Sequence, residues 1–318
     1  MPLSSLLSPG QYRKLRALYH NSRAAYVRRF RSFGTTEVQT AYLELGVRAG
    51  DCVMLHSGFG RDTGFIGTVD AFTDAILDAL GEDGTFVMPS LAYRGAALDY
   101  LSNLELFDVR KTPSMMGLVS EFFRRRDNVL RSLNPMHPVV AIGARAEWLV
   151  SGHEDAVYSC GPDTPWSRLL EVDAKVLFFD TSFAAFTFFH HIEHEVSPKL
   201  PFPLYAEPPF DVPVADQAGN RKIVRTYAFS REAIRRRRFA VFEDELGVHV
   251  SAVNPRSIYR TIVAEEGMEG EWVRLSAILR RRLAEGVGAE PVVVDYGQFR
   301  DKGRIGRTMG VMAGGPFL

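Results

Sequence analysis

Apolar and polar positions follow two different periods from residue 36 onward, and this predicts helices separated by short strands. The helical patterns begin at capping residues such as Thr36 and Thr68 and end at glycines such as Gly46 and Gly81. The expected elements of this part are a helix over 36–45, a strand over 52–56, a helix over 69–80 and a strand over 84–89. Strand, helix and strand in this order indicate a right-handed crossover within a parallel or mixed sheet.

The middle and the end of the chain continue the pattern less regularly. Residues 90–112 are loop-like, and prolines between 198 and 213 indicate a boundary between two lobes. Before that boundary we expect a helix over 115–124, a strand-like segment over 129–143, a short helix after 161–166 and a strand over 174–179. After it we expect a strand over 222–226, a basic helix around 235–238, a helix near 271–285 and a strand over 291–295.

Residues 10–31 place large apolar side chains at roughly helical spacing, with seven basic residues between them. The favoured interpretation is a surface helix that packs through its aromatic stripe and leaves its arginines in solvent. A lipid-binding or partner-binding helix is the alternative. The stripe consists of Tyr12, Leu15, Leu18, Tyr19, Tyr26 and Phe30.

These elements predict an α/β fold with a mixed, largely parallel central sheet, flanked by helices and followed by a smaller C-terminal lobe. We divide the chain into a basic helical extension (1–34), a core (35–197) and a C-terminal lobe (198–318). The 318 residues are 46% hydrophobic, which suffices for a sizeable core. Lysine plus arginine and aspartate plus glutamate balance at 38 each, so composition gives no sign of a nucleic-acid binder.

The number of cysteines and the hydropathy of the chain indicate the cellular compartment in which the protein is found. The two cysteines, Cys52 and Cys160, form neither a metal-binding spacing nor a disulfide framework. No segment has the length and apolarity of an export signal or a membrane span. We therefore expect a cytoplasmic protein that does not engage a membrane.

Candidate chemistry concentrates in residues 180–195, directly after the strand over 174–179. On a helix Thr187, His190 and Glu193 would share one flank, with His194 one turn beyond His190. A histidine beside a carboxylate is a common general base near neutral pH. The alternative is zinc held by His190 and His194, although no third ligand is evident and the order is not His-Glu-x-x-His.

Glycines at 58, 60, 64 and 67 fill the loop before the predicted helix over 69–80. A glycine-rich loop that enters a helix N-terminus can bind an anion through its backbone N–H groups. The spacing matches neither the dinucleotide fingerprint nor the phosphate loop of nucleotide hydrolases. Glycines that only permit turns are the alternative.

Short motifs recur in a fixed order over about residues 36–196. They are Leu45-Gly46-Val47, Gly50-Asp51, His56-Ser57, Gly67, the run from Gly84 to Pro89, Phe107-Asp108, Met116-Gly117, Arg131-Ser132, Gly161, Thr164-Pro165 and Thr187-x-x-His190-x-x-Glu193. In this order they resemble the aminoglycoside 3-N-acetyltransferase family of coenzyme-A-dependent antibiotic acetyltransferases.

The resemblance implies roles for particular residues. His190 would be the catalytic base, with Glu193 as the acidic residue of the same motif and Thr187 in support. The coenzyme site would include His56, Ser57, Gly58, Phe59, Gly67 and Thr68, with Arg131 and Ser132 beside the cleft. We assign Asp108, Ser230 and Glu232 to the acceptor. Acetyl-coenzyme A would be the co-substrate, a small-molecule amine the acceptor, and no metal is expected. The expected partners also include a second copy of the chain, in a homodimer.

Several positions depart from the family pattern. Asn134 and Pro138 stand where histidine and serine are usual, Thr164 replaces a serine, and Phe186 stands where resistance enzymes often carry asparagine. We therefore expect retained catalytic groups with an altered acceptor surface, acting on an aminoglycoside or a related amino sugar. The alternatives are a biosynthetic N-acyltransferase acting on another amine or a sugar nucleotide, a metal-dependent hydrolase, and a binding-only relative. Roles for His137, His191 and His194 stay open.

Overall fold

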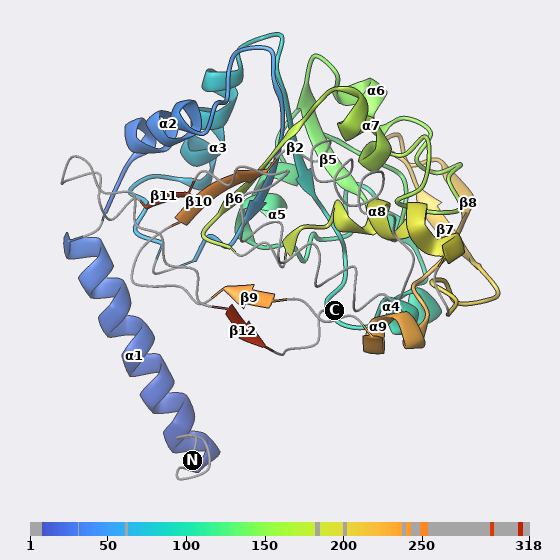
Figure 1. Cartoon of the computed structure of the whole chain (residues 1–318), viewed down its shortest axis with the longest axis horizontal. Coiled ribbons are helices and arrows are strands. Elements are labelled where there is room, and N and C mark those ends of the chain that lie inside the picture. Colours follow the sequence, from blue (N-terminus) through green and yellow to red (C-terminus); the bar gives the residue numbers. More distant parts are fainter. Residues whose placement is uncertain are drawn as a thin grey trace.

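A computed structural model describes residues 8–30, 32–60, 63–181, 185–199, 202–236, 240–242, 249–253, 293–295 and 311–313. Its main feature is a seven-stranded sheet in the order β11-β10-β6-β1-β2-β5-β4 (Figure 1). The strands are β1 (Cys52–Ser57), β2 (Thr85–Pro89), β4 (Leu130–Arg131), β5 (Val139–Gly143), β6 (Lys175–Phe179), β10 (His249–Val253) and β11 (Val293–Asp295).

Strand β1 lies at the centre of the sheet and pairs in parallel with both β2 and β6. The flanking strands β5 and β10 pair antiparallel with β2 and β6. The fold class predicted from sequence is confirmed as a mixed α/β sheet, and its parallel part is the centre.

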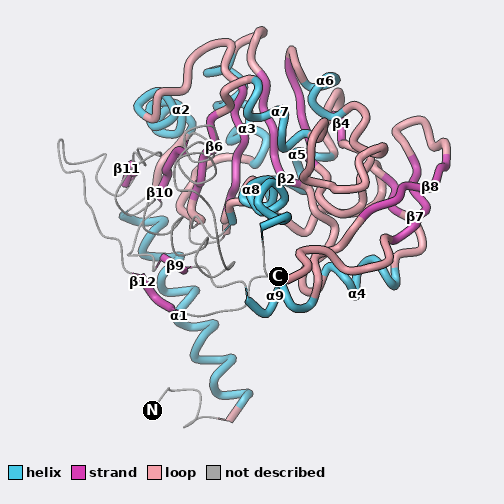
Figure 2. Tube along the Cα trace, turned by 45° about the vertical axis from the view of Figure 1, so that its right-hand side comes forward, coloured by secondary structure: helices cyan, strands magenta, loops and turns pink. Residues whose placement is uncertain are grey.

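Helices cover both faces of this sheet because successive residues of a strand point to opposite sides. Met54 of β1 belongs to one hydrophobic core and Leu55 to the other. The helices α2 (Thr35–Glu44), α3 (Val69–Leu80) and α5 (Leu118–Arg124) pack on the Leu55 side, and α6 (Ala146–Val150), α7 (Pro165–Glu171) and α8 (Phe189–Val196) on the Met54 side. In the view of Figure 2, α8 is seen nearly end-on against the strands of the sheet.

A second sheet of three strands joins parts of the chain that are far apart in sequence. It consists of β3 (Phe107–Asp108), β7 (Phe210–Ala215) and β8 (Arg221–Thr226), and α4 (Ala97–Asn103) packs against β7. The short 3₁₀ helix Ser197–Lys199 follows α8, and α9 (Arg231–Arg236) follows β8. Strands β9 (Ala240–Phe242) and β12 (Val311–Ala313) pair with each other. Because β7 pairs with β3 and β10 pairs with β6, both sheets cross residue 198. The three-part division stays a prediction.

Most elements predicted from sequence are confirmed to within a few residues. The strand-like segment 129–143 differs, since β4 and β5 pair antiparallel with each other around the prolines at 135 and 138. The elements that were not expected are α4, β3, α6, β7, β9, β10 and β12. Helix α9 ends at Arg236, while Arg237, Arg238 and the helix expected near 271–285 lie outside the described residues.

Helix α1 (Pro9–Phe30) forms as predicted. Its apolar stripe, however, does not pack against the rest of the protein as expected. Tyr12, Leu15, Leu18, Tyr19, Tyr26 and Phe30 are all exposed. In Figure 1 the helix runs away from the body of the molecule. Among the described residues, no helix combines the length and apolarity needed to cross a bilayer.

Candidate active site

The catalytic pair predicted from sequence meets at the start of α8. Nδ1 of His190 is in direct hydrogen-bond contact with Oε2 of Glu193, one turn further along the helix. The Glu193 side chain is fully buried, whereas 14% of the His190 side chain is exposed. Because a carboxylate only accepts, Nδ1 of His190 carries the proton of this bond, and the lone pair of the neutral ring lies on Nε2.

Thr187 shapes the turn into α8. Its hydroxyl donates to the carbonyl of Ala185 at 3.2 Å, and its own carbonyl accepts from the amide of His190 at 3.0 Å. The structure therefore brings Thr187 to His190 through the backbone.

Two rings flank His190. The ring centroid of His137 lies 4.9 Å away and that of Phe229 lies 4.8 Å away. His137 comes from the loop between β4 and β5, and its carbonyl accepts from the indole of Trp166 at 3.1 Å. The sequence left the role of His137 open, and the structure places this buried histidine against the candidate base.

A buried hydrogen-bond network holds His137. Its Nδ1 lies 2.7 Å from the hydroxyl of Ser159, whose carbonyl is 2.8 Å from Nε2 of His153. Nε2 of His153 must donate to that carbonyl, so its Nδ1 accepts from the Ser132 hydroxyl at 2.8 Å. Burial lowers the pKa of His153 to about 4, which keeps its ring neutral.

The other histidines of α8 have separate partners. Nδ1 of His191 donates to the carbonyl of Cys160 at 2.7 Å, and Nδ1 of His194 lies 2.8 Å from the Tyr205 hydroxyl. Burial lowers the pKa of both rings. Within the described part of the chain, no group of three or more His, Cys, Asp and Glu side chains is placed to hold a metal ion. The geometry therefore does not favour the zinc interpretation of His190 and His194.

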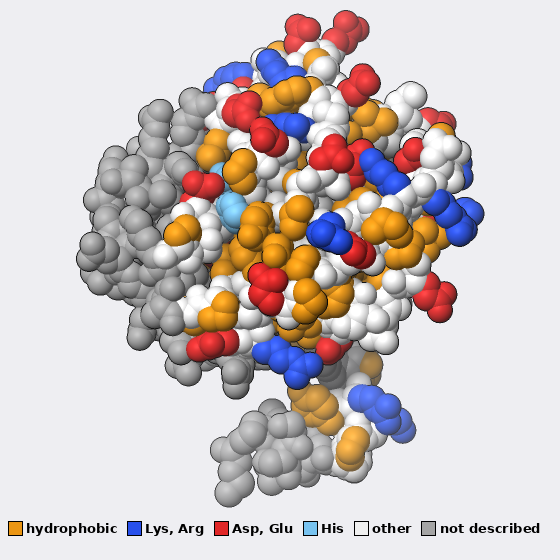
Figure 3. All heavy atoms as spheres, turned by 90° about the vertical axis from the view of Figure 1, so that its right-hand side faces the viewer, with side chains coloured by type: hydrophobic (Ala, Val, Ile, Leu, Met, Phe, Trp, Pro, Cys, Tyr) orange, Lys and Arg blue, Asp and Glu red, His pale blue; other side chains and the backbone are white. Residues whose placement is uncertain are grey.

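Aromatic rings extend from His190 toward solvent and form what we call the aromatic wall, which consists of Phe229, Tyr205, Tyr158 and Tyr227. Phe229 stacks on Tyr205 at 5.7 Å, and Tyr205 lies 4.8 Å from Tyr158. Tyr158 stacks on Tyr227 at 5.0 Å and is 38% exposed. Figure 3 shows hydrophobic side chains gathered on the face of the molecule that carries β7 and β8.

His56 is the residue before the end of β1 and lies on the same sheet face as α8. Its ring stacks on Phe178 of β6 at 5.1 Å, and burial lowers its pKa to about 3. Nε2 of this neutral histidine is buried and has no hydrogen-bond partner among the described residues. An unpaired buried nitrogen is costly, and a ligand or water that reached it would remove that cost.

The loop after β1 is held by its own contacts. The amide of Gly58 donates to Phe179 at 2.8 Å, and the amide of Gly60 donates to Thr63 at 2.8 Å. The amide of Phe59 contacts the Ser57 hydroxyl at 3.4 Å. These amides are therefore not ready-made donors for an oxyanion.

Phe59, Gly67 and Thr68, which were also assigned to the coenzyme site, each have a role in the fold. The ring of Phe59 packs against Phe72 and Phe179 in the core. Gly67 has a φ of +155°, and Thr68 caps α3 by accepting from Ala71 at 3.0 Å. Their assignment to a coenzyme site stays a prediction.

Arg131 is buried, and its two terminal guanidinium nitrogens donate to main-chain carbonyls, while its buried Nε has no hydrogen-bond partner among the described residues. Its guanidinium donates to Ser90 at 2.5 Å and to Thr112 at 2.5 Å, and it lies over the ring of Phe107 at 4.7 Å. Burial, and next the nearby charge of Arg124, lower its pKa to about 9. Arg131 thus ties the segment after β2 to the segment after β3, while its neighbour Ser132 belongs to the His153 network. A coenzyme contact by either residue stays a prediction.

The three residues assigned to the acceptor are not brought together with His190 by any described contact. The Asp108 carboxylate accepts from the amides of Arg110 and Lys111 at 2.9 and 3.1 Å. Ser230 caps α9 and donates to the carbonyl of Pro203 at 2.6 Å. Glu232 lies in the first turn of α9. Their role in acceptor binding stays a prediction.

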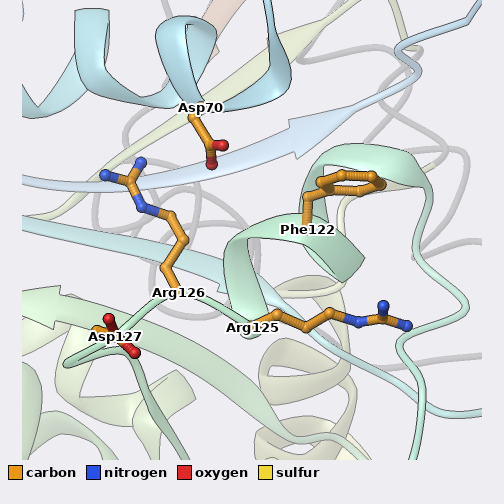
Figure 4. Close-up of a pocket in the computed structure, with 5 residues that line it drawn as sticks. All are labelled: Asp70, Phe122, Arg125, Arg126 and Asp127. Carbon is orange, nitrogen blue, oxygen red and sulfur yellow. The ribbon is translucent and has the colours of Figure 1, made fainter.

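An open pocket of about 480 Å³ lies between the first turn of α3 and the end of α5. It is lined by Asp70, Phe122, Arg125, Arg126 and Asp127 (Figure 4). Arg126 reaches toward α3, where it donates to Thr73 and pairs with Asp74 at 2.6 Å, while Arg125 pairs with Glu121 at 2.5 Å.

Sequence reasoning missed this pocket and the ring of Phe229. The run Phe122-Phe123-Arg124-Arg125-Arg126 at a helix end was the available signal for the pocket. No local signal existed for Phe229, because it reaches His190 from a segment 39 positions away in the sequence.

Comparison with known proteins gives one family. The family model described as aminoglycoside 3-N-acetyltransferase matches residues 54–258. Aminoglycoside N(3)-acetyltransferase III of Pseudomonas aeruginosa is 29% identical over 167 residues, which cover 48% of this chain and 61% of that protein. Aminoglycoside N(3)-acetyltransferase IV of Salmonella sp is 32% identical over 166 residues, with 50% and 58% covered. The chain thus spans about three fifths of the curated relatives that it matches.

Solved structures agree on the fold. The structure of AAC-IIIb with CoASH has a TM-score of 0.56 and 22% identity, and covers 83% of this chain and 92% of its own. The crystal structure of the aminoglycoside acetyltransferase AAC(3)-Xa has a TM-score of 0.59 and 21% identity, with 87% and 94% covered. At these identities the likeness concerns the fold alone.

Proposed function

Because the chain belongs to the aminoglycoside 3-N-acetyltransferase family, we propose that it transfers an acetyl group from acetyl-coenzyme A to an amine of an aminoglycoside or related amino sugar. The observation that carries this proposal is the contact between His190 and the buried carboxylate of Glu193. An ammonium group cannot attack a thioester, so the acceptor reacts as the neutral amine after losing one proton to solvent, and a base must take a second proton as the nitrogen adds to the carbonyl. Nε2 of His190 is the nitrogen that can take it.

The reaction then proceeds by addition and elimination. The amine nitrogen forms a bond to the thioester carbonyl carbon while His190 accepts the amine proton. The carbon–sulfur bond breaks next, and coenzyme A leaves as the thiolate, which the protonated His190 can protonate. Glu193 holds the ring through Nδ1–H and stabilises the imidazolium that forms between these steps.

Two features support a coenzyme A site. The relative AAC-IIIb was solved with CoASH. The pocket between α3 and α5 is not counted among them, because its arginines pair with Glu121 and Asp74, and it lies on the sheet face opposite α8. The unpaired Nε2 of His56 offers a polar partner at the end of β1.

The aromatic wall suggests what kind of acceptor the site favours. Tyrosine rings pack against the apolar face of a sugar ring and attract a nearby cation. Of the acidic residues on these segments, Asp211 pairs with Arg225 at 2.7 Å and Glu154 pairs with Lys222 at 2.7 Å, whereas Glu207 accepts from the Tyr227 hydroxyl at 3.3 Å and can face an amine. We therefore propose an acceptor with few amines and an exposed ring face in preference to a polycation. A biosynthetic amino sugar fits this description.

The cellular location and the oligomeric state expected from sequence are part of the same proposal. Both cysteines are buried thiols, which suits a reducing, cytoplasmic setting. A homodimer stays part of the proposal without a described contact to support it.

Coenzyme A release, followed with a thiol reagent, tests the activity. Mono- and diamino sugars should be acetylated with a higher kcat/KM than polyamine aminoglycosides. His190→Gln should lower kcat/KM by about 10²–10⁴-fold, while His20→Gln, on exposed α1, should leave it unchanged. A wild-type chain that binds acetyl-coenzyme A but releases no thiol with any amine would support the binding-only alternative instead.

A substitution in the aromatic wall tests whether this surface binds the acceptor. Tyr158→Ala should raise the KM for the amino sugar about tenfold, in line with the loss of a ring contact of about 1–1.5 kcal/mol. The KM for acetyl-coenzyme A should not change. Tyr12→Ala is the matched control, because Tyr12 and Tyr158 are both 38% exposed. Equal effects of the two substitutions would argue against the wall as an acceptor surface.

A further inference from the structure

Helix α1 leaves a large apolar surface uncovered. Leu18 is 67% exposed, Tyr19 58% and Phe30 54%. Among its described side chains only Val27 is buried, and residues 9–22 with described side chains are exposed on every side. Figures 1 and 3 both show this helix protruding from the body.

The exposed apolar residues share one flank of the helix. At about 100° per residue, the six side chains of the stripe fall within an arc of about 120°. A helix of this length gains most of its stability from packing such a face against something. The stripe therefore needs a partner with an apolar component.

The charge of the segment specifies that partner further. Residues 1–36 contain seven lysines and arginines and no acidic residue, whereas the rest of the chain contains 31 basic and 38 acidic residues. Arg13, Lys14, Arg28 and Arg29 are exposed. No residue of the helix can pair with them internally, because α1 contains no carboxylate. The partner should therefore be anionic as well as partly apolar.

We propose that α1 lies along an anionic lipid surface. Its leucines and aromatic rings would enter the boundary between headgroups and acyl chains, and its arginines would reach the phosphates on either side. Three tyrosines in the stripe suit this boundary, because they combine an apolar ring with a hydroxyl that stays hydrated. Pairing with α1 of a second copy would instead bring six positive charges against six. This proposal replaces the expectation from sequence that no membrane is involved.

Vesicle co-sedimentation of the full chain tests the proposal. Binding to vesicles of phosphatidylcholine and phosphatidylglycerol should exceed binding to phosphatidylcholine alone by at least about tenfold, since each basic residue near such a surface contributes about fivefold. High salt should reduce the difference. The double variant Leu15→Ser, Leu18→Ser should bind anionic vesicles at least about tenfold more weakly, because two buried leucines are lost.

Ile223→Ser is the matched control, because Ile223 on β8 is 62% exposed and lies outside α1. It should bind vesicles like the wild type, and all variants should release coenzyme A at the wild-type rate in the absence of vesicles. Equal binding to neutral and anionic vesicles, or unchanged binding of the double variant, would overturn the proposal. So would a wild-type dimer in light scattering that the double variant converts to a monomer, since a second copy would then cover the stripe.

Discussion

Neighbouring histidines of α8 differ in chemistry because each meets a different partner. His190 contacts a buried carboxylate, His191 donates to a carbonyl, and His194 meets the hydroxyl of Tyr205. Only the first arrangement favours the protonated ring that a general base must pass through. The assignment of His190 as base therefore rests on Glu193, whose carboxylate has no exposed surface.

Replacing Glu193 by glutamine tests this dependence. Glu193→Gln keeps the size of the side chain but removes the charge that stabilises the imidazolium. We expect kcat to fall by about 10–100-fold, a part of the total that a general base contributes. The acidic limb of the kcat/KM profile should move to lower pH, because the ring becomes harder to protonate.

A purely structural role for Glu193 would give a different result. It would lower the amount of folded enzyme while leaving the pH profile of the remaining activity unchanged. Circular dichroism and active-site titration separate these cases. An unaltered profile with normal kcat per folded molecule would remove Glu193 from the mechanism.

At the scale of elements, the site depends on two strand ends that approach closely. Strands β1 and β6 pair in parallel as far as Ser57 and Phe179, and the loops that follow remain in contact. A Cβ atom at Gly58 would lie 2.0 Å from the carbonyl oxygen of Asp180. Only glycine allows this contact, since both partners are backbone and neither can rotate away.

Gly58→Ala should therefore lower the free energy of unfolding by about 1–3 kcal/mol, the usual cost of overpacking. Urea denaturation followed by fluorescence measures this change. Gly10→Ala, where nothing lies within 4 Å, should change stability by less than about 1 kcal/mol. Equal stabilities of the Gly58 variant and the wild type would mean that the loop after β6 moves aside without cost.

The sequence predicted individual helices and strands better than the contacts between distant segments. Periodicity and capping located α3 and β1 because those signals lie within a few residues. The aromatic wall could not be found in this way, since Tyr158, Tyr205 and Tyr227 meet only after β8 and α8 have packed. The same holds for Arg131, which a motif placed beside a cleft and which in the structure joins the segments after β2 and β3.

At the scale of the whole molecule, stability should depend on pH through buried neutral histidines. The pKa values of His56 and His153 are lowered from 6.5 to about 3 and about 4 by burial. Above pH 6.5 both rings are neutral whether the chain is folded or not. Below it the unfolded chain takes up protons that the folded chain does not, so stability falls as the pH drops toward 4 and then 3.

The free energy of unfolding should consequently be about 2 kcal/mol lower at pH 5 than at pH 7 for each of these histidines. Carboxylates contribute little in this window: although burial alone would raise the pKa of Glu121, hydrogen bonds from Arg124, the Ser114 amide and Arg125 lower it from 4.5 to about 2. Urea denaturation at the two pH values measures the difference. His153→Gln should reduce the difference between the two pH values by about 2 kcal/mol, the share of this one histidine, and an unchanged difference would contradict the assignment.

The pairing of β10 with β6 also has a consequence for synthesis of the chain. Strand β6 is complete at Phe179, but the strand that covers its outer edge begins only at His249. A ribosome needs roughly 4–14 s to add the intervening 70 or so residues at about 5–20 residues per second. During that time the nascent chain carries an open strand edge beside the segment that will hold its catalytic histidine, and an open edge invites pairing with other chains. Translation speed between these two strands is therefore a determinant of how much active protein a cell obtains.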